Sequence, residues 1–137
     1  MRIAGLGPES HELSALRALP GVVVENRWVP EDEVAGLLAW SDALVLSHLE
    51  ASQSGVAAVA VAARRWLVAT DVGGLREQLR DEPLARLCPP DAVRLAAAIE
   101  SLITAPPQDT GPPRDPRQGW TDLACDLVAE MRPLLGR

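Results

Sequence analysis

The residues best suited to chemistry lie in one polar segment, Ser47 to Gly55, which separates two apolar runs. Glu50 supplies a carboxylate, and Ser52 and Ser54 supply hydroxyls just before a stretch of Ala and Val that favours a helix. At the start of a helix the first backbone N–H groups lack partners, and the helix dipole favours negative charge. We therefore expect Ser52 to Gly55 to bind a phosphate group without the help of a lysine. The simpler alternative is that Ser52 only caps the helix and Gly55 only packs closely against a neighbour.

Three other places carry weaker signals. His48 lies two residues before the glutamate and could pair with it in acid–base chemistry, although a lone histidine in a loop is more often a surface residue. Gly5 and Gly7 form only part of a dinucleotide-binding fingerprint, because Ser10 occupies the third glycine position. Trp28 could stack on a nucleobase or another flat ring, or it could be buried beneath the following helix. The sequence has no G-x-S-x-G segment, so serine hydrolase chemistry is not indicated.

Short apolar runs alternate with helical patterns along most of the chain. The expected strands cover Arg2–Leu6, Val22–Val24, Asp42–Ser47, Trp66–Ala69 and Leu84–Leu87, and the expected helices cover Glu9–Leu19, Pro30–Leu38, Ser52–Ala63, Gly74–Arg80 and Asp91–Ile103. Ser10 and Asp91 are placed to cap two of these helices. Continuously apolar strands separated by helices indicate βαβ crossovers, and therefore an α/β fold with a doubly wound parallel sheet. In such a sheet ligands bind at the carboxyl ends of the strands, where the polar segment Ser47 to Gly55 and the glycines Gly5 and Gly7 are expected to lie.

The composition limits what the protein can be. The chain of 137 residues suits one domain, and its 13 basic residues, all of them Arg, are outnumbered by 19 acidic ones, for a net charge of −6. Without a basic cluster, nucleic-acid binding is not expected. Cys88 and Cys125 cannot form a disulfide framework and lack the spacing of metal ligands. No signal peptide is evident and the longest apolar run, Val56–Ala63, is too short to span a membrane, so we expect a cytoplasmic protein without an integral membrane segment.

The sequence divides into three parts. Residues 1–104 carry the alternating pattern and are expected to form a Rossmann-like domain that binds the ligand. Residues 105–118 contain five of the 12 prolines and predict a stiff linker. Residues 119–137 return to helical spacing through Leu123, Leu127 and Met131, which predicts a C-terminal helix.

Four motifs follow one another in a recognisable order: Arg2–Pro8; Trp28–Glu31 with Leu37-Leu38 and Ser41–Ala43; Glu50–Val56; and Val68–Glu77. Together they resemble the C-terminal half of group 1 glycosyltransferases, of the GT-B fold and the family 4 type. The resemblance covers Arg2 to about Ile103, and the segment from Gly119 to Leu135 resembles the last helix of the family. It implies a Rossmann-like domain that is incomplete at its N-terminus, because in the family one more strand and helix precede the first motif.

The resemblance implies a domain that binds a nucleotide-sugar donor for glycosyl transfer. Glu50 matches the first glutamate of the E-x7-E motif of the family, which lies beside the hydroxyls of the donor sugar. The resemblance implies further donor contacts from three loops. They are Ser52, Gln53, Ser54 and Gly55 in the phosphate loop, Trp28 and Val29 in the nucleobase loop, and Gly5 and Gly7 in the first glycine-rich loop. Gly73 and Gly74 match a glycine pair with a structural role. Neither a metal ion nor another cofactor is implied, because basic side chains and helix dipoles neutralise the leaving diphosphate in this fold.

Two departures from the family keep a second hypothesis open. Ala58 stands where the second glutamate of the family meets the ribose, and the sequence lacks the segment whose Arg and Lys clasp the diphosphate. It also lacks the acceptor-binding N-terminal domain, so transfer is expected to need a partner chain that supplies this domain, or a homo-oligomer. The alternative is a non-catalytic binding or assembly module derived from a glycosyltransferase half. A phosphate-binding receiver domain fits less well, because no acidic cluster for Mg²⁺ follows a strand.

Overall fold

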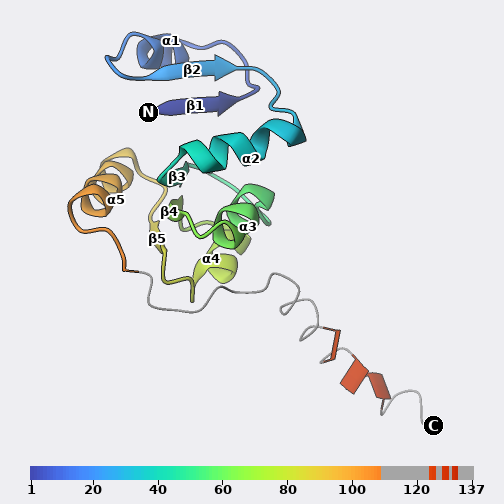
Figure 1. The fold of residues 1–137 in the computed structure, drawn as a ribbon. Helices are drawn as coiled ribbons and strands as arrows, with labels where there is room; N and C mark the ends of the chain where they lie inside the picture. Colours follow the sequence, from blue (N-terminus) through green and yellow to red (C-terminus); the bar gives the residue numbers. More distant parts are fainter. Residues whose placement is uncertain (109–123, 126–127, 130, 133–137) are drawn as a thin grey trace. The chain divides into compact units, whose positions relative to one another are not determined.

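The computed structural model describes residues 1–108, 124–125, 128–129 and 131–132 (Figure 1). The chain divides into two compact units, unit 1 from Met1 to Trp40 and unit 2 from Ser41 to Arg137, which are described separately. Most of the predicted linker, 105–118, and of the predicted C-terminal helix, 119–137, lies outside the described residues. The predicted division into domain, linker and helix therefore stays a prediction.

Unit 1 consists of β1 (Arg2–Gly5), α1 (His11–Arg17), β2 (Val23–Asn26) and α2 (Glu31–Trp40). The two strands pair in parallel, with Ile3 opposite Val24. Parallel strands have their carboxyl ends at the same edge, so the loops that follow β1 and β2 begin side by side. Gly7 lies in the loop after β1, close to Gly5 at the end of that strand, and Trp28 lies in the loop after β2.

Unit 2 consists of β3 (Ala43–Leu46), α3 (Gly55–Ala62), β4 (Trp66–Thr70), α4 (Gly73–Leu79), β5 (Ala85–Cys88) and α5 (Ala92–Thr104). Its strands form a parallel sheet in the order β3-β4-β5. In this sheet Val68 of β4 lies opposite Val45 on one side and Arg86 on the other. Figure 1 shows α5 on one face of the sheet and α3 and α4 on the other.

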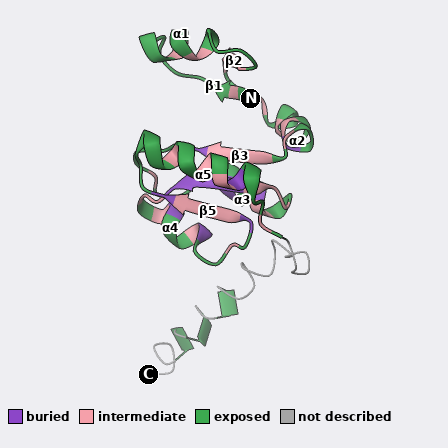
Figure 2. Ribbon diagram, turned by 90° about the vertical axis from the view of Figure 1, so that its left-hand side faces the viewer, coloured by how far each residue is buried: buried purple, intermediate pink, exposed green. Residues whose placement is uncertain are grey.

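The hydrophobic core lies in unit 2, on both faces of β4 (Figure 2). Val68 packs with Cys88 and Leu102 beneath α5. Because side chains alternate along a strand, the fully buried Leu67 points to the opposite face, where α3 packs on β4. In unit 1, all of whose residues are described, Leu38 is the only buried residue. The best-buried element of unit 2 is therefore its central strand, β4.

Two helices, α1 and α5, begin at the capping residues that the sequence predicts. The Ser10 hydroxyl oxygen accepts a hydrogen bond from the Leu13 N–H at 3.2 Å and so caps α1. Asp91 caps α5 by accepting hydrogen bonds from the N–H groups of Val93 and Arg94, both at 3.0 Å. Parallel strands that alternate with helices confirm the predicted α/β, Rossmann-like fold. In the described part of the chain, none of the helices is long and apolar enough to cross a membrane.

Candidate functional site

The predicted phosphate-binding segment forms the connection between β3 and α3, at the carboxyl end of the unit 2 sheet. Two following elements hold its backbone. The buried hydroxyl of Thr70, at the end of β4, lies within hydrogen-bond distance of the carbonyl oxygens of His48, at 2.5 Å, and Leu46, at 3.3 Å. From α4, the Gly74 N–H donates to the Ala51 carbonyl oxygen at 3.0 Å. The path of the connection is therefore set by β4 and α4.

A glycine pair allows α4 to approach this connection closely. A Cβ added to Gly74 would overlap the carbonyl oxygen of Ser52 and come 2.8 Å from its carbonyl carbon. A Cβ added to Gly73 would overlap the carbonyl oxygen of Ala51, and Gly73 has a φ of +46°, in the left-handed region that favours glycine. No side chain fits at either position, which confirms the structural role expected of the pair.

The helix α3 begins at Gly55 rather than at Ser52, because its cap is Ser54. The Ser54 hydroxyl oxygen accepts a hydrogen bond from the Ala57 N–H at 3.2 Å. The alternative in which Ser52 caps the helix is therefore wrong. Ser52 is an exposed residue whose carbonyl faces the glycine pair of α4.

Gln78 of α4 explains why the second serine is the cap. Its side-chain amide accepts a hydrogen bond from the Ser54 N–H at 3.1 Å and donates one to the Ser54 carbonyl oxygen at 3.0 Å. These bonds hold Ser54 extended, with φ −128° and ψ 114°, which is the backbone conformation of an N-cap residue. Sequence reasoning misses Gln78, because it is 24 positions from its partner and no neighbouring residue marks it as part of a site.

Two backbone N–H groups at the start of α3 have no partner within the described part of the chain. The Ser54 N–H is bound by Gln78 and the Ala57 N–H by the Ser54 hydroxyl, which leaves those of Gly55 and Val56. Both residues are exposed, and nothing lies within 4 Å of a Cβ built on Gly55. The alternative in which Gly55 packs closely against a neighbour is therefore wrong. Free N–H groups at the positive end of a helix suit an anion.

The other predicted donor contacts of unit 2 are exposed. Glu50, Ser52 and Gln53 all reach solvent, and the described structure gives the Glu50 carboxylate no protein partner. His48 is exposed as well, and no described hydrogen bond joins its ring to that carboxylate. The predicted acid–base pair is therefore not formed in this structure, while the glutamate is open to a ligand.

The arginine of α4 is paired with an aspartate. Arg76 donates from Nε and Nη2 to the two carboxylate oxygens of Asp71, at 2.7 Å and 3.0 Å, and this pairing raises the pKa of Arg76. Two positions along a helix turn the side chain by about 200°, so Arg76 and Gln78 lie on nearly opposite faces of α4. Arg76 is therefore committed to Asp71 rather than free to bind an anion.

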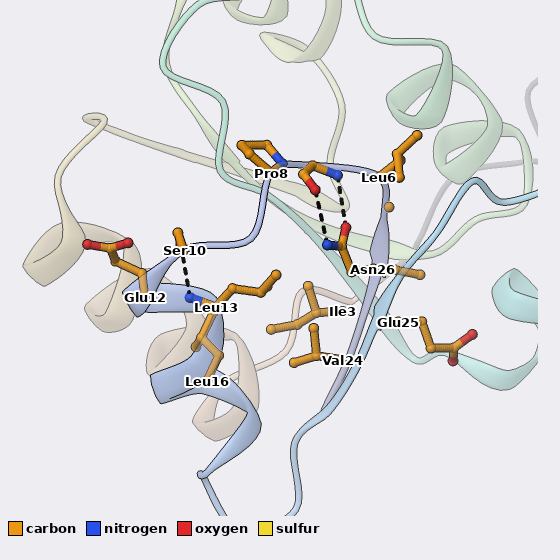
Figure 3. Close-up of a pocket in the computed structure, with 13 residues that line it drawn as sticks. Ile3, Leu6, Pro8, Ser10, Glu12, Leu13, Leu16, Val24, Glu25 and Asn26 are labelled. Carbon is orange, nitrogen blue, oxygen red and sulfur yellow. Dashed lines mark hydrogen bonds between the residues drawn. The ribbon is translucent and has the colours of Figure 1, made fainter.

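In unit 1, a side-chain amide also holds the glycine-rich loop (Figure 3). Asn26 accepts a hydrogen bond from the Gly7 N–H at 2.9 Å and donates one to the Gly7 carbonyl oxygen at 3.0 Å. It also donates to the Glu9 carboxylate at 2.7 Å. Beside this loop lies a pocket of about 350 Å³ between α1 and the two strands, lined by residues that include Gly5, Gly7, Ile3, Leu13, Leu16 and Val24. The predicted glycines therefore border a real cavity, although its walls are largely apolar.

The loop after β2 exposes an aromatic ring. Trp28 is 74% exposed, so the alternative in which it is buried beneath α2 is wrong. Val29 beside it is half-buried. Arg27 is bound by the carboxylates of Glu33, at 2.5 Å, and Glu25, at 2.9 Å, which raise the pKa of Arg27. The indole ring is therefore available for stacking, while the adjacent cation is already neutralised.

Acid titration tests the ion pair that closes the glycine-rich loop. Arg17 donates to both Glu9 carboxylate oxygens, at 2.6 Å and 2.9 Å, and with Asn26 it lowers the pKa of Glu9 from 4.5 to about 2. A lowered pKa in the folded state stabilises unit 1 above about pH 4.5, and this contribution disappears as the pH falls through 2. We expect an NMR titration of the Glu9 carboxyl to have its midpoint near pH 2 and Arg17→Met to raise it. A midpoint near 4.5 in the unaltered chain would contradict the ion pair.

Comparison with known proteins identifies the family. The family model described as group 1 glycosyl transferases matches residues 1–105, which include every described strand and the helices α1 to α5. No curated protein and no solved structure matched the chain. The matched region contains the braced connection before α3, the glycine pair of α4 and the exposed tryptophan loop. Because the match covers well over half of the sequence, the chain belongs to the group 1 glycosyltransferases.

Proposed function

We propose that this chain binds the diphosphate of a nucleotide-sugar donor at the start of α3 and takes part in glycosyl transfer. The family supplies the reaction class. The observation that carries the proposal is the pair of free, exposed N–H groups of Gly55 and Val56, at the carboxyl end of the parallel sheet of unit 2. Ligands of open α/β sheets bind at this edge, and phosphates favour helix N-termini.

Each of the proposed contacts has a distinct chemical task. The N–H groups of Gly55 and Val56 donate to phosphate oxygens, and the dipole of α3 stabilises the negative charge that grows on the leaving diphosphate. The exposed Glu50 carboxylate accepts hydrogen bonds from sugar hydroxyls, which orients the donor sugar. Taken by itself, unit 1 offers the open ring of Trp28, which we propose as a stacking surface for a flat ring such as a nucleobase. The N–H groups and the dipole of α3 are the phosphate contacts of this proposal, which includes no metal ion.

An NMR titration with uridine, guanosine and adenosine diphosphates tests donor binding. We expect at least one of them, at millimolar concentration, to shift the amide signals of Gly55 and Val56 and to raise the melting temperature, because binding to the folded state alone stabilises it. The corresponding nucleoside without phosphates is the control and should leave these two signals unchanged. If no diphosphate perturbs them, donor binding at α3 is wrong.

Transfer itself is proposed to require an acceptor-binding domain on a partner chain, or a second copy of this chain. A sugar-transfer assay with the partner present should show activity that Glu50→Ala abolishes. The same variant should still bind a nucleoside diphosphate, because the glutamate is assigned to the sugar. Loss of diphosphate binding in Glu50→Ala would contradict this division of tasks.

A second candidate function is a non-catalytic assembly module. It is favoured by apolar side chains at the start of unit 2 that are open to solvent, namely Leu49 at 77%, Val56 at 50% and Val59 at 43% exposed. Where exposed apolar side chains form one continuous patch, they often mark a contact surface between proteins. It is also consistent with Ala58 at the position of the second family glutamate. Transfer activity that depends on Glu50 would exclude this alternative.

A further inference from the structure

Gln78 makes a two-bond contact to a single residue of the neighbouring loop. Its carboxamide oxygen accepts from the Ser54 N–H at 3.1 Å, and its nitrogen donates to the Ser54 carbonyl oxygen at 3.0 Å. Gln78 is half-buried and Ser54 is buried, so water competes weakly for these bonds. The contact fixes both the position and the rotation of the Ser54 peptide groups.

Ser54 in turn sets the first turn of α3. Its hydroxyl oxygen accepts from the Ala57 N–H at 3.2 Å, and its carbonyl oxygen accepts from the Ala58 N–H at 3.1 Å. Between them lie Gly55 and Val56, whose N–H directions follow from the same turn. The helix from Gly55 to Ala62 has no polar side chain of its own that could brace this end. The orientation of these two free N–H groups therefore depends on the hydrogen bonds between Gln78 and Ser54.

We propose that Gln78 is a positioning residue for the phosphate group, acting through Ser54 on the N–H groups of Gly55 and Val56. This inference rests on the proposed function and adds a residue outside the loop. Gln78 touches no ligand itself. It also takes the Ser54 N–H out of the set of ligand donors, although Ser54 belongs to the predicted phosphate-binding segment Ser52–Gly55.

Gln78→Met tests the proposal, since methionine keeps the length of the side chain but forms neither bond. We expect the affinity for the nucleoside diphosphate that binds the unaltered chain to fall about tenfold, as two neutral hydrogen bonds that hold the loop are lost. Gln108→Met is the matched control. It makes the same chemical change at an exposed residue beyond α5, and it should leave the affinity unchanged.

Gln78→Glu supplies a second measurement, the pH dependence of nucleotide binding, which would not change if Gln78 had a purely structural role. A protonated carboxylic acid can accept from the Ser54 N–H and donate to its carbonyl oxygen, whereas a carboxylate cannot donate. The elements that meet at this contact carry His48 and Glu50 in the connection from β3, and Arg76 and Glu77 on α4, whereas α3 carries no charged residue. Relative to the unaltered chain at each pH, we expect weak binding at pH 7.5 and recovery at pH about 4.5, where a glutamate is partly protonated.

The outcomes separate this inference from the function on which it rests. No nucleotide binding by the unaltered chain would overturn both. Unchanged affinity of folded Gln78→Met, with normal binding by the unaltered chain, would overturn the role of Gln78 alone. If Gln78→Met does not fold, equal relative affinities of Gln78→Glu at the two pH values would overturn that role, and recovery at the lower pH would support it.

Discussion

Replacing Gly74 with alanine is expected to lower the free energy of unfolding of unit 2 by about 3 kcal/mol, the upper part of the range for overpacking. The added methyl group would overlap the Ser52 carbonyl oxygen, and both sides of this contact are backbone, which cannot rotate away. Either the start of α4 or the connection from β3 must move, and the bond from the Gly74 N–H to the Ala51 carbonyl is then lost. Urea denaturation followed by circular dichroism measures the change.

A second glycine of the chain provides the control for this variant. Gly36 lies inside α2, and nothing is within 4 Å of a Cβ built on it. Gly36→Ala should therefore stabilise unit 1 by about 0.5–1 kcal/mol through the better helix propensity of alanine. If the two substitutions change the free energy of unfolding in opposite directions, the space around each glycine, rather than the loss of a glycine, decides the result. Equal stability of Gly74→Ala and the unaltered chain would contradict the close approach of α4.

Gly55→Pro is expected to weaken nucleoside diphosphate binding by about tenfold or more while the fold is kept, because it deletes one charge-assisted hydrogen bond to the phosphate. Proline has no N–H, and it is favoured at the first position of a helix. The preceding Ser54 is already extended, as a residue before proline must be, and there is open space at Gly55. The variant should therefore melt no lower than the unaltered chain. Calorimetric titration and thermal melts check the two expectations.

Ala92→Pro supplies the matched substitution at a helix start without a proposed ligand. Ala92 is the first residue of α5, and its cap, Asp91, is extended with φ −135° and ψ 136°. Asp91 binds the N–H groups of Val93 and Arg94, so the Ala92 N–H is not needed for the cap. This variant should keep full affinity for the nucleotide. Full affinity in Gly55→Pro as well would remove the helix start of α3 from the proposed site.

Local signals made the fold predictable, whereas the details of the site depend on distant contacts. Ser10 and Asp91 each cap a helix within three residues, so their roles could be inferred from the adjacent sequence. At α3 two serines compete as caps, and the choice is made by Gln78, which comes 24 positions later. The exposure of Trp28 could not be predicted either, because it depends on packing rather than on pattern. The helix start proposed as an anion site could be located from the sequence, since polar residues before an apolar helix are a local signal.

The bracing of the connection between β3 and α3 has a consequence for how the protein is made. Thr70 and Gln78 follow the residues that they hold by 22 and 24 positions. A chain that emerges from the ribosome therefore exposes Glu50 and Ser54 well before the groups that fix their backbone exist. Contacts between residues far apart in the sequence form late in folding, since a loop must close before they are gained. The partners that join β3 to β4 are about equally far apart in the sequence, so the proposed phosphate site forms no earlier than this strand pair, and a chain without β4 and α4 is expected not to bind nucleotides.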